Sequence, residues 1–120
     1  MEEKKAFEND TFYTISNLPI EKIIELLKEA KELSYEWWID ILNVNKSFAR
    51  QRIDMGFDDV LKRVDSSTHF VFIHRKGYPD WEHYLEIGFR TMEANDHFLF
   101  IHVDEKKLKY FIDKYALEKL

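Results

Sequence analysis

Three stretches of sequence decide the fold of this chain: HFVFIHR (residues 69–75), WEHYLEIGFRT (residues 81–91) and HFLFIHV (residues 97–103). Each is rich in the β-branched and aromatic residues that favour strands. Turn-forming residues separate them, with Gly77 and Pro79 in the first interval and Asn95 and Asp96 in the second. The three stretches therefore predict an antiparallel meander.

The faces of this meander are unusual because both are apolar. A half-solvated antiparallel strand alternates apolar with polar residues, and these three stretches do not. Helices of the same chain can cover one face of the sheet. The other face is expected to meet something else.

Helices are predicted on both sides of the meander. Apolar residues at helical spacing mark residues 20–33, which begin after Pro19, and residues 104–119, for which Asp104 supplies an N-cap. Two shorter helices are expected at residues 46–54 and 57–64.

Two further segments have strand-like composition. Residues 11–16 form a short β-branched and aromatic run that ends before Pro19. Residues 35–45 fit either a helix or a buried strand, and their aromatic and β-branched content favours the strand.

The predicted fold class is therefore α+β. It consists of a three-stranded antiparallel meander, which residues 11–16 and 37–44 can extend to four or five strands, packed against the N- and C-terminal helices. The short middle helices are expected to cap an edge or part of the second face. Residues 1–120 fit a single globular domain, with residues 1–9 partly disordered.

Composition excludes several classes of function. A net charge of -5 argues against an extended nucleic-acid surface, and the absence of cysteine removes thiolate zinc sites and cysteine nucleophiles. The longest apolar windows are far shorter than the about 20 residues that span a bilayer. The expectation is a cytoplasmic protein that binds neither nucleic acid nor membrane.

Register predicts which side chains share a face. If five-residue loops close both hairpins, Arg75 faces Trp81 and Glu86 faces His102. One face then carries the core: Val71, Ile73, Trp81, His83, Leu85, Ile87, Phe89, Leu99, Ile101 and Val103. The other face carries rings, carboxylates and two histidines: Phe70, Phe72, His74, Glu82, Tyr84, Glu86, Arg90, Phe98, Phe100 and His102.

The second face is the candidate functional surface. Its aromatic residues are expected to bind a protein partner or a second copy of the chain: Phe70, Phe72, Tyr84, Phe98 and Phe100. No catalytic motif occurs in the sequence, so a non-enzymatic binding or regulatory protein is the favoured function.

Two alternatives stay open. In the first, a small hydrolase-like enzyme uses Glu86 and His102 as an acid–base pair on neighbouring strands. In the second, a small-molecule sensor uses a pocket between the sheet and Trp37 and Trp38. The five histidines are scattered over two faces in this register, so neither a metal site nor a cofactor is expected.

Overall fold

The computed structural model describes residues 11–15, 18–43, 49–67, 69–76, 83–92 and 95–120, without the side chains of Lys76, His83 and Tyr84. The predicted disorder of residues 1–9 and the predicted turn at residues 77–80 lie outside the described residues.

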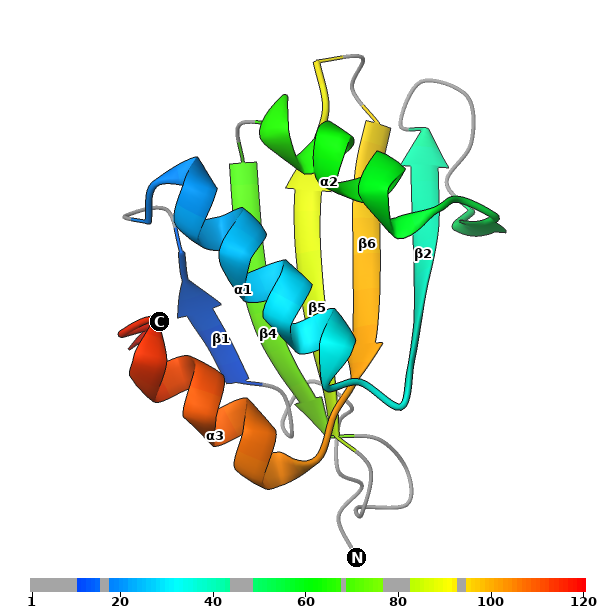
Figure 1. Ribbon diagram of the computed structural model, residues 1–120. Helices are drawn as coiled ribbons and strands as arrows, with labels where there is room; N and C mark the ends of the chain where they lie inside the picture. Colours follow the sequence, from blue (N-terminus) through cyan, green and yellow to red (C-terminus); the bar gives the residue numbers. More distant parts are fainter. Residues whose placement is uncertain (1–10, 16–17, 44–48, 68, 77–82, 93–94) are drawn as a thin grey trace, which may run out of the picture.

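The described strands form one antiparallel sheet in the order β3-β2-β6-β5-β4-β1-β7 (Figure 1). Its strands are β1 (Thr11–Thr14), β2 (Glu36–Asn43), β3 (Gln51–Ile53), β4 (His69–Lys76), β5 (His83–Arg90), β6 (Asn95–His102) and β7 (Glu118–Lys119). The prediction of an α+β protein with an antiparallel sheet is confirmed. The sheet is wider than the three to five strands expected.

All three described helices lie on one face of the sheet: α1 (Ile20–Glu32), α2 (Phe57–Asp65) and α3 (Glu105–Lys114) (Figure 1). Buried residues from each helix share one apolar core with the sheet, including Leu27 of α1, Val60 of α2 and Phe111 of α3. The expectation that the middle helix caps an edge or the second face is therefore wrong. Because α2 joins the same layer as α1, the opposite face of the sheet has no described helix over it.

Local sequence explains where the helices begin and end. The buried residues of α1 recur every three or four positions, which gives the helix one apolar face: Ile23, Leu26, Leu27 and Ala30. The carboxylate of Asp104 accepts a hydrogen bond from the Lys107 backbone N–H at 2.8 Å, which confirms the predicted N-cap of α3.

Two segments near the ends of predicted helices form strands instead. Residues 51–53, predicted as helix, are strand β3, where Ile53 pairs with Ile39 of β2. The last helix ends at Lys114 rather than at residue 119, because Ala116 has a φ of 50° and reverses the chain into β7. The strand assignment favoured for residues 35–45 is confirmed by β2.

The predicted register of the first hairpin is wrong. His74 pairs with Leu85 and Phe70 with Phe89, whereas the five-residue loop paired Phe70 with Glu86. The pairing is displaced by three residues, an odd number, so every side chain of β4 changes face. The second hairpin is displaced by two residues, with Arg90 opposite Asp96, so β5 and β6 keep their predicted faces.

The helix-covered face consequently holds Phe70 and Phe72 rather than Val71 and Ile73. Phe72 is fully buried in the core cluster, and Phe70 packs against that cluster. Leu85, Ile87, Leu99 and Ile101 lie on the same face, as predicted, and all four are fully buried.

Candidate functional site

The face of the sheet opposite the helices is called the open face here. Since neighbouring residues along a strand point to opposite faces, the residues that alternate with core residues lie on it. The strand register arranges them in four rows across the central strands: His69, Arg90, Asp96 and Leu42; then Val71, Gly88, Phe98 and Asp40; then Ile73, Glu86, Phe100 and Trp38; and lastly Arg75, Tyr84, His102 and Glu36.

Only part of the predicted aromatic surface lies together on this face. Phe98 and Phe100 of β6 are on it, in neighbouring rows. Phe70 and Phe72 lie on the helix-covered face, because of the displaced register of β4. The backbone of Tyr84 pairs with His102, and its side chain is outside the described part of the structure.

Side chains of the third row largely bury one another. The ring of Phe100 is 9% exposed and stacks on Trp38, with centroids 5.0 Å apart and planes 14° apart. The Arg52 guanidinium lies 4.9 Å from the Trp38 ring. These contacts stabilise β2 and β3 against β6 through stacking and cation–π attraction.

Glu86 is a buried carboxylate on the open face. It is 2% exposed, and the Arg75 guanidinium donates a hydrogen bond to Oε1 at 2.7 Å. A buried charge requires such a partner, since removing one member of a buried pair leaves a costly uncompensated charge. This ion pair gives Glu86 a structural role between β4 and β5.

The proposed acid–base pair is not brought directly together. Glu86 lies opposite Phe100 and His102 lies opposite Tyr84, so the predicted pairing of Glu86 with His102 is wrong. The His102 ring instead packs against Tyr35, with centroids 5.1 Å apart. The cause is the two-residue displacement of the second hairpin, which leaves the two side chains on the same face but in different rows.

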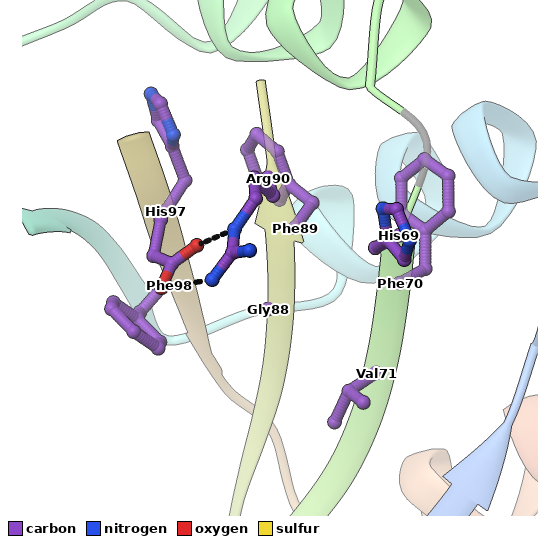
Figure 2. A pocket seen from close by; sticks show the side chains of 9 residues that line it. His69, Phe70, Val71, Gly88, Phe89, Arg90, His97 and Phe98 are labelled. Carbon is purple, nitrogen blue, oxygen red and sulfur yellow. Dashed lines mark hydrogen bonds and ion pairs between the residues drawn. The ribbon is translucent and has the colours of Figure 1, made fainter. Parts of the chain in front are cut away.

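Residues of the first two rows on β4, β5 and β6 line an open hollow of about 460 Å³ at one end of the sheet (Figure 2). Gly88 lies in the middle of the second row, directly opposite both Val71 and Phe98. Because Gly88 has no side chain, its backbone forms the floor between those two neighbours. Val71 is 38% exposed, so the apolar wall of the hollow is accessible.

Charged groups border the hollow. Arg90 donates hydrogen bonds to both carboxylate oxygens of Asp96, from Nε at 2.6 Å and from a terminal nitrogen at 3.2 Å (Figure 2). The Asp96 carboxylate raises the pKa of Arg90 through these hydrogen bonds. On the other side, the Arg50 guanidinium lies 3.6 Å from the Phe98 ring centroid. The site therefore combines an apolar floor with ionised edges.

A buried histidine supports the hollow from the helix side. His97 is fully buried and stacks on Phe89, with ring centroids 4.9 Å apart. Its Nε2 lies 2.9 Å from the Arg63 guanidinium, which can only donate, and its Nδ1 lies 3.1 Å from the Asn95 carbonyl oxygen. With Nε2 as the acceptor, this geometry corresponds to the tautomer that carries the proton on Nδ1.

A second polar cluster links α1 to α3, in the helix layer on the other side of the sheet from the open face. Glu29 accepts hydrogen bonds from Lys114 at 2.8 Å, Tyr110 at 2.6 Å and Tyr115 at 3.0 Å. These donors, Lys114 foremost, lower the pKa of Glu29. Burial, followed by the hydrogen bond to Glu29, raises the pKa of Tyr115. All four groups are occupied with one another, so the cluster is a structural clamp.

The described residues offer neither a metal cluster nor a membrane-spanning helix. They contain no group of three histidine, aspartate or glutamate side chains placed to hold a metal ion. None of their helices has the length and apolar character required to cross a bilayer.

Sequence reasoning missed Val71, the accessible apolar wall of the hollow. It assigned Val71 to the core and placed Gly88 opposite Phe100, whereas Gly88 lies between Val71 and Phe98. A glycine inside a strand was the available signal, since such a glycine often marks a close approach by a ligand or another backbone.

Comparison with known proteins returned no match: no family model, no curated protein and no solved structure is significantly similar to the chain. Functional inference accordingly depends on the geometry of the open face.

Proposed function

We propose that this chain is a non-enzymatic protein-binding module and that the open face of its sheet is the binding surface. The observation that carries the proposal is the one-sided placement of the helices. With α1, α2 and α3 on the same face, the open face presents apolar side chains that those helices do not cover (Figure 1).

Exposure along the open face supports this function. Phe12 is 39% exposed and Val71 is 38% exposed, and both lie on neighbouring strands. Contiguous exposed apolar residues bordered by charged ones are typical of protein-interaction sites. Arg90 and Asp96 provide such a border beside Val71.

The chemistry of the same face favours binding over catalysis. Its buried carboxylate, Glu86, is engaged by Arg75 at 2.7 Å. Arg90 and Asp96 are engaged with each other at 2.6 Å. The carboxylates of Glu86 and Asp96 are thus held in ion pairs, whereas the apolar hollow beside them is accessible.

Peptide display against the immobilised protein tests this function. Peptides selected on the wild-type chain should bind Val71→Asp at least tenfold more weakly, since the substitution places a charge on the apolar wall. Lys109→Glu is the matched control, because Lys109 is exposed on α3, a helix of the opposite layer. Equal binding to Val71→Asp and to the wild type would contradict the proposal.

A further inference from the structure

Nothing in the described structure requires a glycine at position 88 of β5. None of the described glycines has a positive φ. A Cβ built on Gly88 meets nothing closer than the His97 carbonyl oxygen at 3.9 Å and Phe98 Cδ1 at 4.0 Å, which is ordinary van der Waals contact. Glycine inside a strand costs about 0.5–1 kcal/mol relative to alanine. The described fold therefore tolerates a side chain where the sequence has none.

The register shows what such a gap can receive. Phe98 lies directly opposite Gly88 on the adjacent strand, so a half-buried ring, with the Arg50 guanidinium 3.6 Å from its centroid, and an empty position are neighbours in one row. Adjacent strands are about 4.8 Å apart. Consider a two-fold axis that runs parallel to the strands, in front of the open face and midway between β5 and β6. Rotation about this axis places the Phe98 position of one copy over the Gly88 position of the other.

We propose that a second copy of the chain docks on the open face about this axis. The Phe98 ring of each copy then enters the Gly88 hollow of the other. This inference depends on the proposed function and specifies its partner. The hollow of about 460 Å³ has room for a phenyl ring, and the same operation makes the contact isologous and closed.

Charge complementarity supports the same axis independently. Arg90 and Asp96 are also directly opposite each other on β5 and β6, one row from Gly88. The two-fold operation therefore places Arg90 of each copy over Asp96 of the other. Two cations and two anions then alternate around a square, an arrangement in which every neighbour has the opposite charge.

The outer positions of the third row also match under this operation. Ile73 of β4 and Trp38 of β2 lie at equal distances on either side of the axis, one strand outside β5 and β6. The operation places Ile73 of each copy over the Trp38 indole of the other copy. Apolar residues thus face each other at these two outer positions, whereas the same operation places Val71 over Asp40 in the second row and Phe100 over Glu86 in the third.

The available area predicts a weak dimer. Four strands at about 4.8 Å spacing and eight residues at about 3.4 Å per residue provide roughly 500 Å² of flat face per copy. Specific interfaces bury about 600–1,000 Å² per partner, so this contact falls below that range, where weak and transient contacts lie. The net charge of -5 on each copy adds repulsion, which about 0.15 M salt screens beyond roughly 8 Å. For a contact this small, we expect dissociation in the micromolar range or weaker.

Sedimentation equilibrium of the full chain tests the proposal between about 1 and 500 µM, a range chosen to bracket micromolar dissociation. The wild type should pass from the monomer mass of 14.6 kDa towards twice that value. Gly88→Val fills the hollow with a residue that suits a strand, and should remain monomeric at every concentration. Gly56→Ala is the matched glycine control, since Gly56 is the N-cap of α2 in the helix layer and the variant should dimerise like the wild type.

A charge exchange tests the position of the axis. Arg90→Asp and Asp96→Arg each place like charges over one another in the homodimer, so each variant alone should be monomeric. An equimolar mixture should form a heterodimer, because the first variant has carboxylates at both positions and the second has guanidinium groups at both. Circular dichroism of each variant verifies that it is folded.

A wild type that stays monomeric at all concentrations overturns the second copy as partner, as does undiminished dimerisation of Gly88→Val. A mixture of the two charge variants that stays monomeric overturns the axis. None of these results alters the display experiment, in which Val71→Asp reports on binding of peptides to the open face. The two proposals can therefore fail separately.

Discussion

Substituting alanine for Gly88 is expected to stabilise the folded monomer. The added Cβ meets its nearest described atoms at 3.9 and 4.0 Å, so it introduces no strain and requires no movement of β6. The gain is the conformational entropy that glycine loses on folding, about 0.5–1 kcal/mol. For a chain of this length, that free energy corresponds to an increase of roughly 2–5 °C in Tm.

The assay is urea unfolding followed by tryptophan fluorescence, since the chain contains three tryptophans. It should be run near 1 µM, below the expected dimer dissociation constant, because a dimer would add stability to the wild type by mass action. The midpoint should rise while the m-value stays unchanged. A loss of about 1 kcal/mol or more would show that folding itself requires glycine at this position, and the inference from Gly88 to a docking surface would then fail.

Three further predictions concern groups that hold the scaffold. Glu29→Gln should lower the free energy of unfolding by about 1 kcal/mol at pH 7. Lys114 and the tyrosines lower the pKa of Glu29 in the folded state. The stabilisation that ionised Glu29 provides is therefore complete above pH 4.5, its ordinary pKa, and is lost as the pH falls through the lower pKa of the folded state. Wild type and variant should therefore converge in urea titrations at acid pH, and a constant difference down to about pH 2 would refute the clamp. His97→Leu should cost about 1–3 kcal/mol in thermal unfolding, because it removes the hydrogen bonds to Arg63 and to a backbone carbonyl. Asp104→Ala should cost about 1 kcal/mol through loss of the α3 N-cap, and an unchanged Tm would show that the cap is dispensable.

Local signals in the sequence were sufficient for much of the fold. The apolar spacing from Ile20 predicted α1, and Asp104 predicted the start of α3, because both depend on contacts within a few residues. Composition also favoured β2 correctly. These features are set by side-chain period and capping, which a sequence displays directly.

Features that depend on distant pairing were not predictable in the same way. Residues 51–53 form β3 because β2 offers an edge for pairing, and Glu118 and Lys119 form β7 on the edge of β1. A tertiary partner overrides local propensity at such positions. Neither strand has a composition that would identify it alone.

The candidate site depended on register, and a difference of one residue in a loop is enough to invert a strand. The predicted faces of β5 and β6 were correct because the displacement was even, so Phe98 and Phe100 were placed on the open face. The odd displacement of β4 exchanged Phe70 and Phe72 for Val71 and Ile73. Both residue sets are apolar, so hydrophobic pattern could not decide between the two registers.

Amide chemical shifts measured as a function of protein concentration test the central claim most directly. Between about 10 and 500 µM, a range that spans micromolar dissociation, the account predicts progressive shifts for Val71, Gly88, Arg90 and Phe98 on the open face. Amides of α1 and α3 should not change. Shifts confined to the helix layer, or none at any concentration, would contradict the claim that the open face is where this chain associates.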